Sequence, residues 1–60
     1  MSGRLLTPGE VASLLQVRVE LLYKWRWSKL GPPGFKVGRY LRYRESDVLA
    51  WIDAQVRLSS

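Results

Sequence analysis

The segment "LGPPG" at residues 30–34 divides the chain into two parts with different hydrophobic patterns. Two consecutive prolines cannot continue a helix, because proline lacks the amide hydrogen and its ring clashes with the preceding turn. Apolar residues before this segment recur at helical spacing, whereas those directly after it alternate as in a strand. The sequence therefore predicts a helical first half, followed by a second half that begins with β structure.

The first half contains the signals for two helices. In "TPGE", Thr7 is placed to cap a helix, a proline follows at the first helical position, and Glu10 completes a capping box. These signals predict a helix over residues 8–15. A tight turn at Gln16 and Val17, with Val17 as a buried plug, would lead into a second helix over residues 19–29.

The segment after the prolines predicts a β-hairpin and then a third helix. Strands are expected at 35–37 and 40–43, joined at Gly38 and Arg39 by a two-residue type II′ turn, which suits glycine in its first position. Alternation would direct four apolar residues inward (Phe35, Val37, Leu41, Tyr43) and four others outward (Lys36, Tyr40, Arg42, Arg44). The third helix would begin near "ESDV" at 45–48, where two acids favour its positive end, and would fray by Leu58.

Apolar burial must supply the stability of this chain. It has sixty residues and neither cysteine nor histidine, so no disulfide or zinc site can help a core near the lower size limit of a domain. We expect one domain over residues 1–60, ordered from about 5 to 57. The expected core comprises Leu14, Leu15, Val17, Leu21, Leu22, Trp25, Phe35, Val37, Leu41, Tyr43, Leu49, Trp51 and Ile52.

The charge of the chain points to a polyanionic partner. Ten lysines and arginines against five acids leave a net charge of +5, and seven of the ten lie between Lys24 and Arg44. Nucleic acid is the first candidate and an anionic membrane surface the second; a role in solubility alone is the alternative. Because no long apolar run or signal peptide is present, we expect a cytoplasmic protein without a membrane span.

The second helix combines an apolar face with a cationic, aromatic face. Leu21, Leu22 and Trp25 share the face assigned to the core. The opposite face carries Val19, Glu20, Tyr23, Lys24, Arg26 and Trp27, unless the two aromatic residues also belong to the core. Two helices joined by a tight turn and followed by a basic hairpin predict a winged helix-turn-helix, mainly α with a small hairpin. In that fold the second helix enters the major groove of DNA and the hairpin, or wing, contacts the backbone or a minor groove.

Three segments carry a family resemblance: "LLTPGEVASLLQV", "LLYKWR" and "GPPGFKVGRYLRYRESDVLAWI". In this order, over about residues 5–53, the chain resembles the MerR-like winged-helix family, and within it the excisionases (recombination directionality factors) of phages and integrative elements. The resemblance implies an architectural protein whose copies bind side by side on attachment-site DNA and could form a filament along it. These copies would bend the DNA and direct a phage integrase toward excision. Full MerR regulators carry a long dimerisation helix and an effector domain that this sequence does not show. The chain also departs from the family at three positions. Family members often have glycine where Gln16 stands, a serine or threonine cap near Arg18, and a basic residue where Trp27 lies.

The resemblance implies a recognition helix over residues 19–29 and a wing over Lys36–Arg42. We expect phosphate or groove contacts from Arg18, Lys24, Arg26 and Arg39, with the wing formed by Lys36, Gly38, Arg39, Tyr40 and Arg42. Tyr23 and Glu20 are the expected readers of base edges, because a carboxylate can accept from a cytosine amino group. Glu20 could instead orient Lys24, four residues later. Arg42 could contact DNA or pair with an acid of the third helix.

Catalysis is not expected. With no histidine or cysteine and with each carboxylate assigned to a cap or a helix surface, the sequence offers no acid–base or nucleophilic pair. We expect no cofactor, metal or small-molecule ligand. Two other functions stay open beside the excisionase: a small phage or plasmid transcription regulator, and a protein-docking module of a DNA-packaging or recombination complex.

Overall fold

The computed structural model describes residues 3–59, which form three helices and a three-stranded antiparallel sheet. In chain order the elements are β1 (Leu5–Leu6), α1 (Pro8–Leu15), α2 (Val19–Trp27), β2 (Phe35–Val37), β3 (Tyr40–Arg44) and α3 (Glu45–Ser59). The expected order of two helices, a hairpin and a third helix is confirmed, and the fold is a winged helix-turn-helix. No helix within residues 3–59 is long and apolar enough to cross a membrane.

Helix α1 begins at the predicted capping box. The Glu10 amide donates to Thr7 Oγ1 at 3.1 Å, and the Thr7 amide donates to Glu10 Oε1 at 2.8 Å. The hydrogen bond from the Thr7 backbone holds the pKa of the Glu10 carboxyl below its ordinary value. The helix ends at Leu15 as expected.

Helices α1 and α2 both end in a Schellman motif, in which a residue with left-handed backbone reverses the chain. After α1 this residue is Gln16, with φ 59° and ψ 44°, and the Val17 amide donates back to the Ala12 carbonyl at 3.0 Å. After α2 it is Lys29, with φ 58°, and the Leu30 amide donates to the Trp25 carbonyl at 2.7 Å. The second helix therefore ends at Trp27, two residues earlier than predicted, because the reversal has already begun.

The sheet contains one strand that the sequence did not predict. Strand β3 lies in the centre, with β2 on one side and β1 on the other. Leu5 pairs with Arg44 and Leu6 with Tyr43, so β1 extends the hairpin next to the core. The turn between β2 and β3 has Gly38 at φ 62°, whereas Arg39 is not among the described residues with positive φ, in agreement with a type II′ turn.

The pairing of the hairpin corrects the predicted face assignment. Val37 lies opposite Tyr40 and Phe35 opposite Arg42, whereas Lys36 lies opposite Leu41. Directly paired residues point to the same face, so a two-residue turn places odd-numbered residues of β2 beside even-numbered residues of β3. Phe35 and Val37 therefore share the outer face with Tyr40 and Arg42, and Lys36 lies on the inner face.

The core lies between the two helices of the motif, the sheet and the start of α3. Its buried members are Leu6, Val11, Ala12, Leu22, Leu41, Tyr43 and Val48, with Leu15, Val17, Val19, Trp25 and Ile52 packed against them. Four residues that we expected in the core, Leu14, Phe35, Val37 and Leu49, are exposed. Leu6 and Ala12 are buried instead. Leu6 is buried because β1 packs next to the core, and Ala12 is buried because its small side chain permits close packing of α1. Burial also raises the pKa of the Tyr43 hydroxyl.

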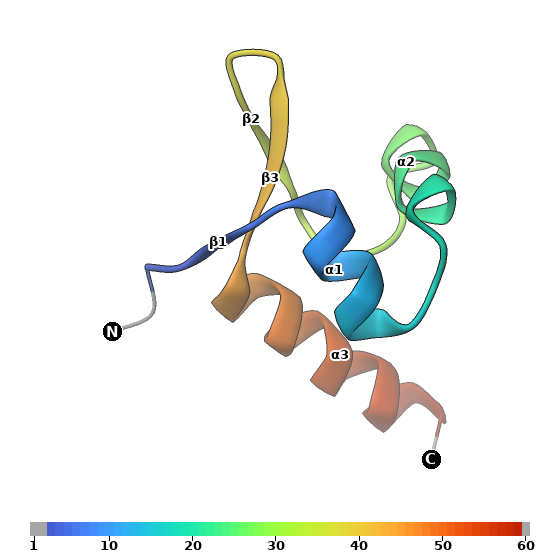
Figure 1. The fold of residues 1–60 in the computed structure, drawn as a ribbon. Helices are drawn as coiled ribbons and strands as arrows, with labels where there is room; N and C mark the ends of the chain where they lie inside the picture. Colours follow the sequence, from blue (N-terminus) through green and yellow to red (C-terminus); the bar gives the residue numbers. More distant parts are fainter. Residues whose placement is uncertain (1–2, 60) are drawn as a thin grey trace.

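Helix α2 and the β2–β3 hairpin rise on the same side of the molecule, while α1 and α3 lie beneath them (Figure 1). Trp25, on the inner side of α2, packs against Trp51 of α3 with ring centroids 5.6 Å apart and an interplanar angle of 48°. Gly31 permits this packing, because a Cβ atom there would lie 2.7 Å from the Trp25 ring. The outward side of α2 is thereby held beside the wing.

Candidate nucleic-acid interface

A groove of about 520 Å³ lies between α2 and the inner face of the wing. Helix α2 contributes Tyr23, Arg26 and Trp27 to its walls, and Lys29 adds to them two residues after the end of the helix. The wing contributes Lys36 and Arg39, with Leu41 between the two sides. The groove therefore combines four cationic side chains with two aromatic ones.

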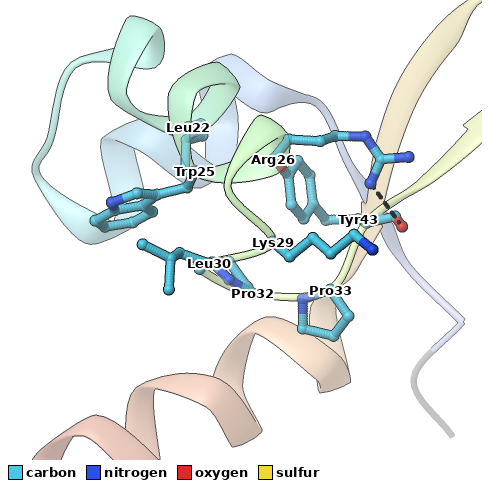
Figure 2. A pocket seen from close by; sticks show the side chains of 10 residues that line it. Leu22, Trp25, Arg26, Lys29, Leu30, Pro32, Pro33 and Tyr43 are labelled. Carbon is cyan, nitrogen blue, oxygen red and sulfur yellow. Dashed lines mark hydrogen bonds between the residues drawn. The ribbon is translucent and has the colours of Figure 1, made fainter.

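Arg26 connects the two walls of the groove. Its guanidinium donates from Nη1 to the carbonyl oxygen of Gly34 at 3.1 Å, at the base of the wing (Figure 2). A guanidinium has five N–H donors, so this bond leaves others for a ligand. Arg26 thus links the base of the wing to α2, and its contact with DNA stays a prediction.

A second hollow, of about 290 Å³, lies beneath the C-terminal end of α2. It is lined by Trp25, by the prolines of the connecting loop and by the buried Tyr43, with Arg26 and Lys29 at its edge (Figure 2). The loop that ends the helical half therefore packs under α2 and supports the residues that line the groove above.

Four other predicted recognition residues lie outside the groove. Arg18 precedes α2 with extended backbone, and its side chain makes no capping hydrogen bond. Glu20 and Lys24 are exposed on α2, and no ion pair joins them among the described residues. The assignment of Val19 to the exposed face of the helix is wrong, because its side chain is partly buried against the core.

The remaining wing residues lie on its outer face or at its tip. The Arg42 guanidinium lies 5.4 Å from the centroid of the Tyr40 ring, and the Arg39 guanidinium lies 5.6 Å from the same centroid. Arg42 also donates to the carbonyl oxygen of Leu41 at 2.7 Å. Of the three acids of α3, Asp47 pairs with a different arginine, Arg44, whose Nε lies 3.5 Å from Asp47 Oδ2. Arg42 forms no ion pair with an acid within residues 3–59, so the predicted alternative of an Arg42–acid pair is wrong.

Sequence reasoning missed Lys29 as a residue of the groove. It assigned Lys29 to the last turn of the second helix, whereas this residue has left-handed backbone beyond the end of α2 and lines the groove. The reversal falls on Lys29 and not on a glycine, the residue that usually takes this conformation, so nothing in the sequence pattern signals it.

Two helices joined by the short turn at 16–18, with a cationic wing beside the second helix, define a winged helix-turn-helix DNA-binding domain. A family model described as a helix-turn-helix domain matches residues 5–56. The chain belongs to this family, a DNA-binding family that includes small excisionase-like proteins. No curated protein and no solved structure matches the chain.

Proposed function

We propose that the protein is an excisionase: an architectural protein that binds and bends attachment-site DNA in several copies and directs an integrase toward prophage excision. The observation that carries the proposal is the groove between α2 and the wing, where Arg26, Lys29, Lys36 and Arg39 surround two exposed aromatic side chains. Cations in this arrangement suit a phosphate backbone that passes between a recognition helix and a wing.

The proposed division of labour follows the positions of the side chains. Helix α2 would lie in the major groove, with Glu20 and Tyr23 at base edges and Lys24 on a phosphate. Arg18 would contact a phosphate at the N-terminal end of the helix. Lys36 and Arg39 would hold the adjacent backbone, and the wing tip at Gly38 and Arg39 suits a narrow minor groove. This role requires no catalysis by the chain and no cofactor.

The membership of small excisionase-like proteins in the family supports recombination as the setting. Bending of the site brings the DNA segments that bind integrase closer together, and a small domain can cause this bending by binding alone. Binding of neighbouring copies along the DNA would add their bends. We further propose that the protein acts in the bacterial cytoplasm, where the DNA and the integrase are found.

Footprinting and gel-shift titration on the DNA that flanks the gene test this proposal. The excisionase role predicts a ladder of complexes as protein is added, with adjacent footprints and altered mobility when the site is moved along a fragment. It also predicts that excision by the neighbouring integrase in a reconstituted reaction depends on the protein. One discrete complex at a promoter, without bending or an effect on excision, would indicate the transcription regulator instead.

A further inference from the structure

Trp27 is an aromatic residue that the fold does not use. Its side chain is 90% exposed, whereas Trp25 and Trp51 pack against each other between α2 and α3. Leaving so large an apolar ring in water gives up the free energy that its burial would supply. The position of Trp27 is therefore better explained by a ligand than by the stability of the domain.

Trp27 faces the groove together with a second aromatic residue. Tyr23 precedes it by one helical turn, is 48% exposed, and lines the same groove. Lys29 also lines the groove on the side of α2, and Lys36 and Arg39 line it on the side of the wing. Two exposed aromatic rings thus line a groove that is bordered by positively charged side chains.

An intact duplex makes little use of such faces. Its surface offers phosphates, sugars and base edges, while the faces of the bases are covered by stacking inside the helix. The cations alone would satisfy the phosphates. Sites that combine a cationic groove with exposed aromatic rings are typical of binding to unpaired nucleotides, because every unpaired base presents a face on which a ring can stack.

We infer that the groove between α2 and the wing also binds unpaired DNA, with a base stacked on Trp27 and its phosphates held by Lys36 and Arg39. Tyr23 offers a second stacking surface one turn along the helix. The inference rests on the same face of the molecule as the proposed function, and it extends the ligand from duplex DNA to single-stranded, bulged or locally opened DNA.

The test compares two fluorescein-labelled probes: an oligothymidine of about twelve nucleotides, and a matched duplex. Trp27→Ala should weaken binding to the oligothymidine by about 5- to 150-fold, the measured range for the loss of one aromatic–base stack. Binding to the duplex should fall by a smaller factor than binding to the oligothymidine, because phosphates supply most of the affinity for the duplex. Trp27→Phe should retain most of the binding to oligothymidine. Oligothymidine should quench the tryptophan fluorescence of the wild-type protein, and this quenching should be weaker in Trp27→Phe, which keeps only Trp25 and Trp51.

Trp27→Lys is the matched control for charge. An added cation should preserve or strengthen binding to the duplex, while binding to the oligothymidine should still fall, since a lysine cannot stack. Circular dichroism on each variant checks that the domain remains folded, as expected for a residue so exposed.

The outcomes separate this inference from the proposed function. Absence of oligothymidine binding by the wild-type protein, an unchanged affinity in Trp27→Ala, or equal losses on both probes would overturn the inference. Oligothymidine binding that depends on Trp27, in a protein that does not bind the duplex, would support the inference and contradict the excisionase role. Tight duplex binding without any oligothymidine binding would contradict the inference and leave the proposed excisionase role supported.

Discussion

Arg18 occupies the position at which a helix of this kind is usually capped by a short polar side chain. Its backbone has the extended conformation of an N-cap residue, with φ −74° and ψ 145°, yet its side chain satisfies none of the free amides of α2. We interpret this residue as one that contributes to DNA binding at some cost to the stability of the helix.

Arg18→Ser should therefore change stability and DNA binding in opposite directions. The serine hydroxyl can accept from an amide in the first turn of α2, which should stabilise the domain by about 1 kcal/mol and raise the Tm by roughly 4–8 °C. Loss of the guanidinium should weaken DNA binding. Arg18→Ala is the control, because it removes the charge without supplying a cap. If Arg18→Ser bound DNA as tightly as the wild-type protein, Arg18 would not be a DNA contact.

Gln16 bears the backbone strain of the turn between the two helices. A residue with a Cβ atom in the left-handed region costs about 1–2 kcal/mol, and glycine avoids this cost but loses more entropy on folding. Gln16→Gly should consequently stabilise the domain by roughly 0.5–1 kcal/mol, the difference between the two effects. Urea denaturation measures the difference, and a less stable glycine variant would show that the glutamine side chain makes a contribution of its own.

The elements with local signals were predictable, and those that depend on distant pairing were not. The capping box at Thr7 and Glu10 determined α1, and Gly38 determined the turn of the hairpin. Strand β1 has only two residues and forms by pairing with β3, nearly forty positions later in the chain, so no local pattern reveals it.

The faces of β3 were predicted correctly, whereas those of β2 were predicted incorrectly although the sequence contained the answer. An alternating pattern fixes the faces within each strand, but the length of the turn fixes how the two strands match. A two-residue turn pairs Val37 with Tyr40, and this excludes a common face for Val37 and Leu41. The groove residues Lys36 and Arg39 follow from this pairing, whereas the position of Lys29 follows from a reversal that helical spacing cannot show.

The wing should contribute to DNA affinity without contributing to sequence preference. Lys36→Ala and Arg39→Ala should each weaken binding to all duplex sequences by a similar factor and reduce the salt dependence by about one unit of slope, as expected for phosphate contacts. Both side chains are exposed, so the stability of the domain should change by less than about 0.5 kcal/mol.

Arg42→Ala is the matched control for the wing, because the Arg42 guanidinium lies over Tyr40 on the outer face. It should affect DNA binding less than either groove variant. Equal affinities for the wild-type protein and both groove variants, measured by fluorescence anisotropy, would remove the wing from the interface.

At the scale of the whole molecule, Trp25 links α2 to α3 and to the core. Trp25→Ala removes the ring that packs on Trp51 and on the core, and should cost roughly 3–5 kcal/mol, enough to unfold most of so small a domain. Trp27→Ala is the control of the same chemistry on the same helix and should leave the Tm nearly unchanged. A folded Trp25→Ala variant beside an unfolded Trp27→Ala variant would mean that the faces of α2 are reversed.

The dependence of duplex binding on salt tests most directly whether the face formed by α2 and the wing binds a phosphate backbone. If about five cations contact phosphates, each contributing a slope of about −0.9, a plot of log K against log salt concentration should fall with a slope of about −4 to −5. A slope near zero for the wild-type protein would contradict the assignment of this face to DNA.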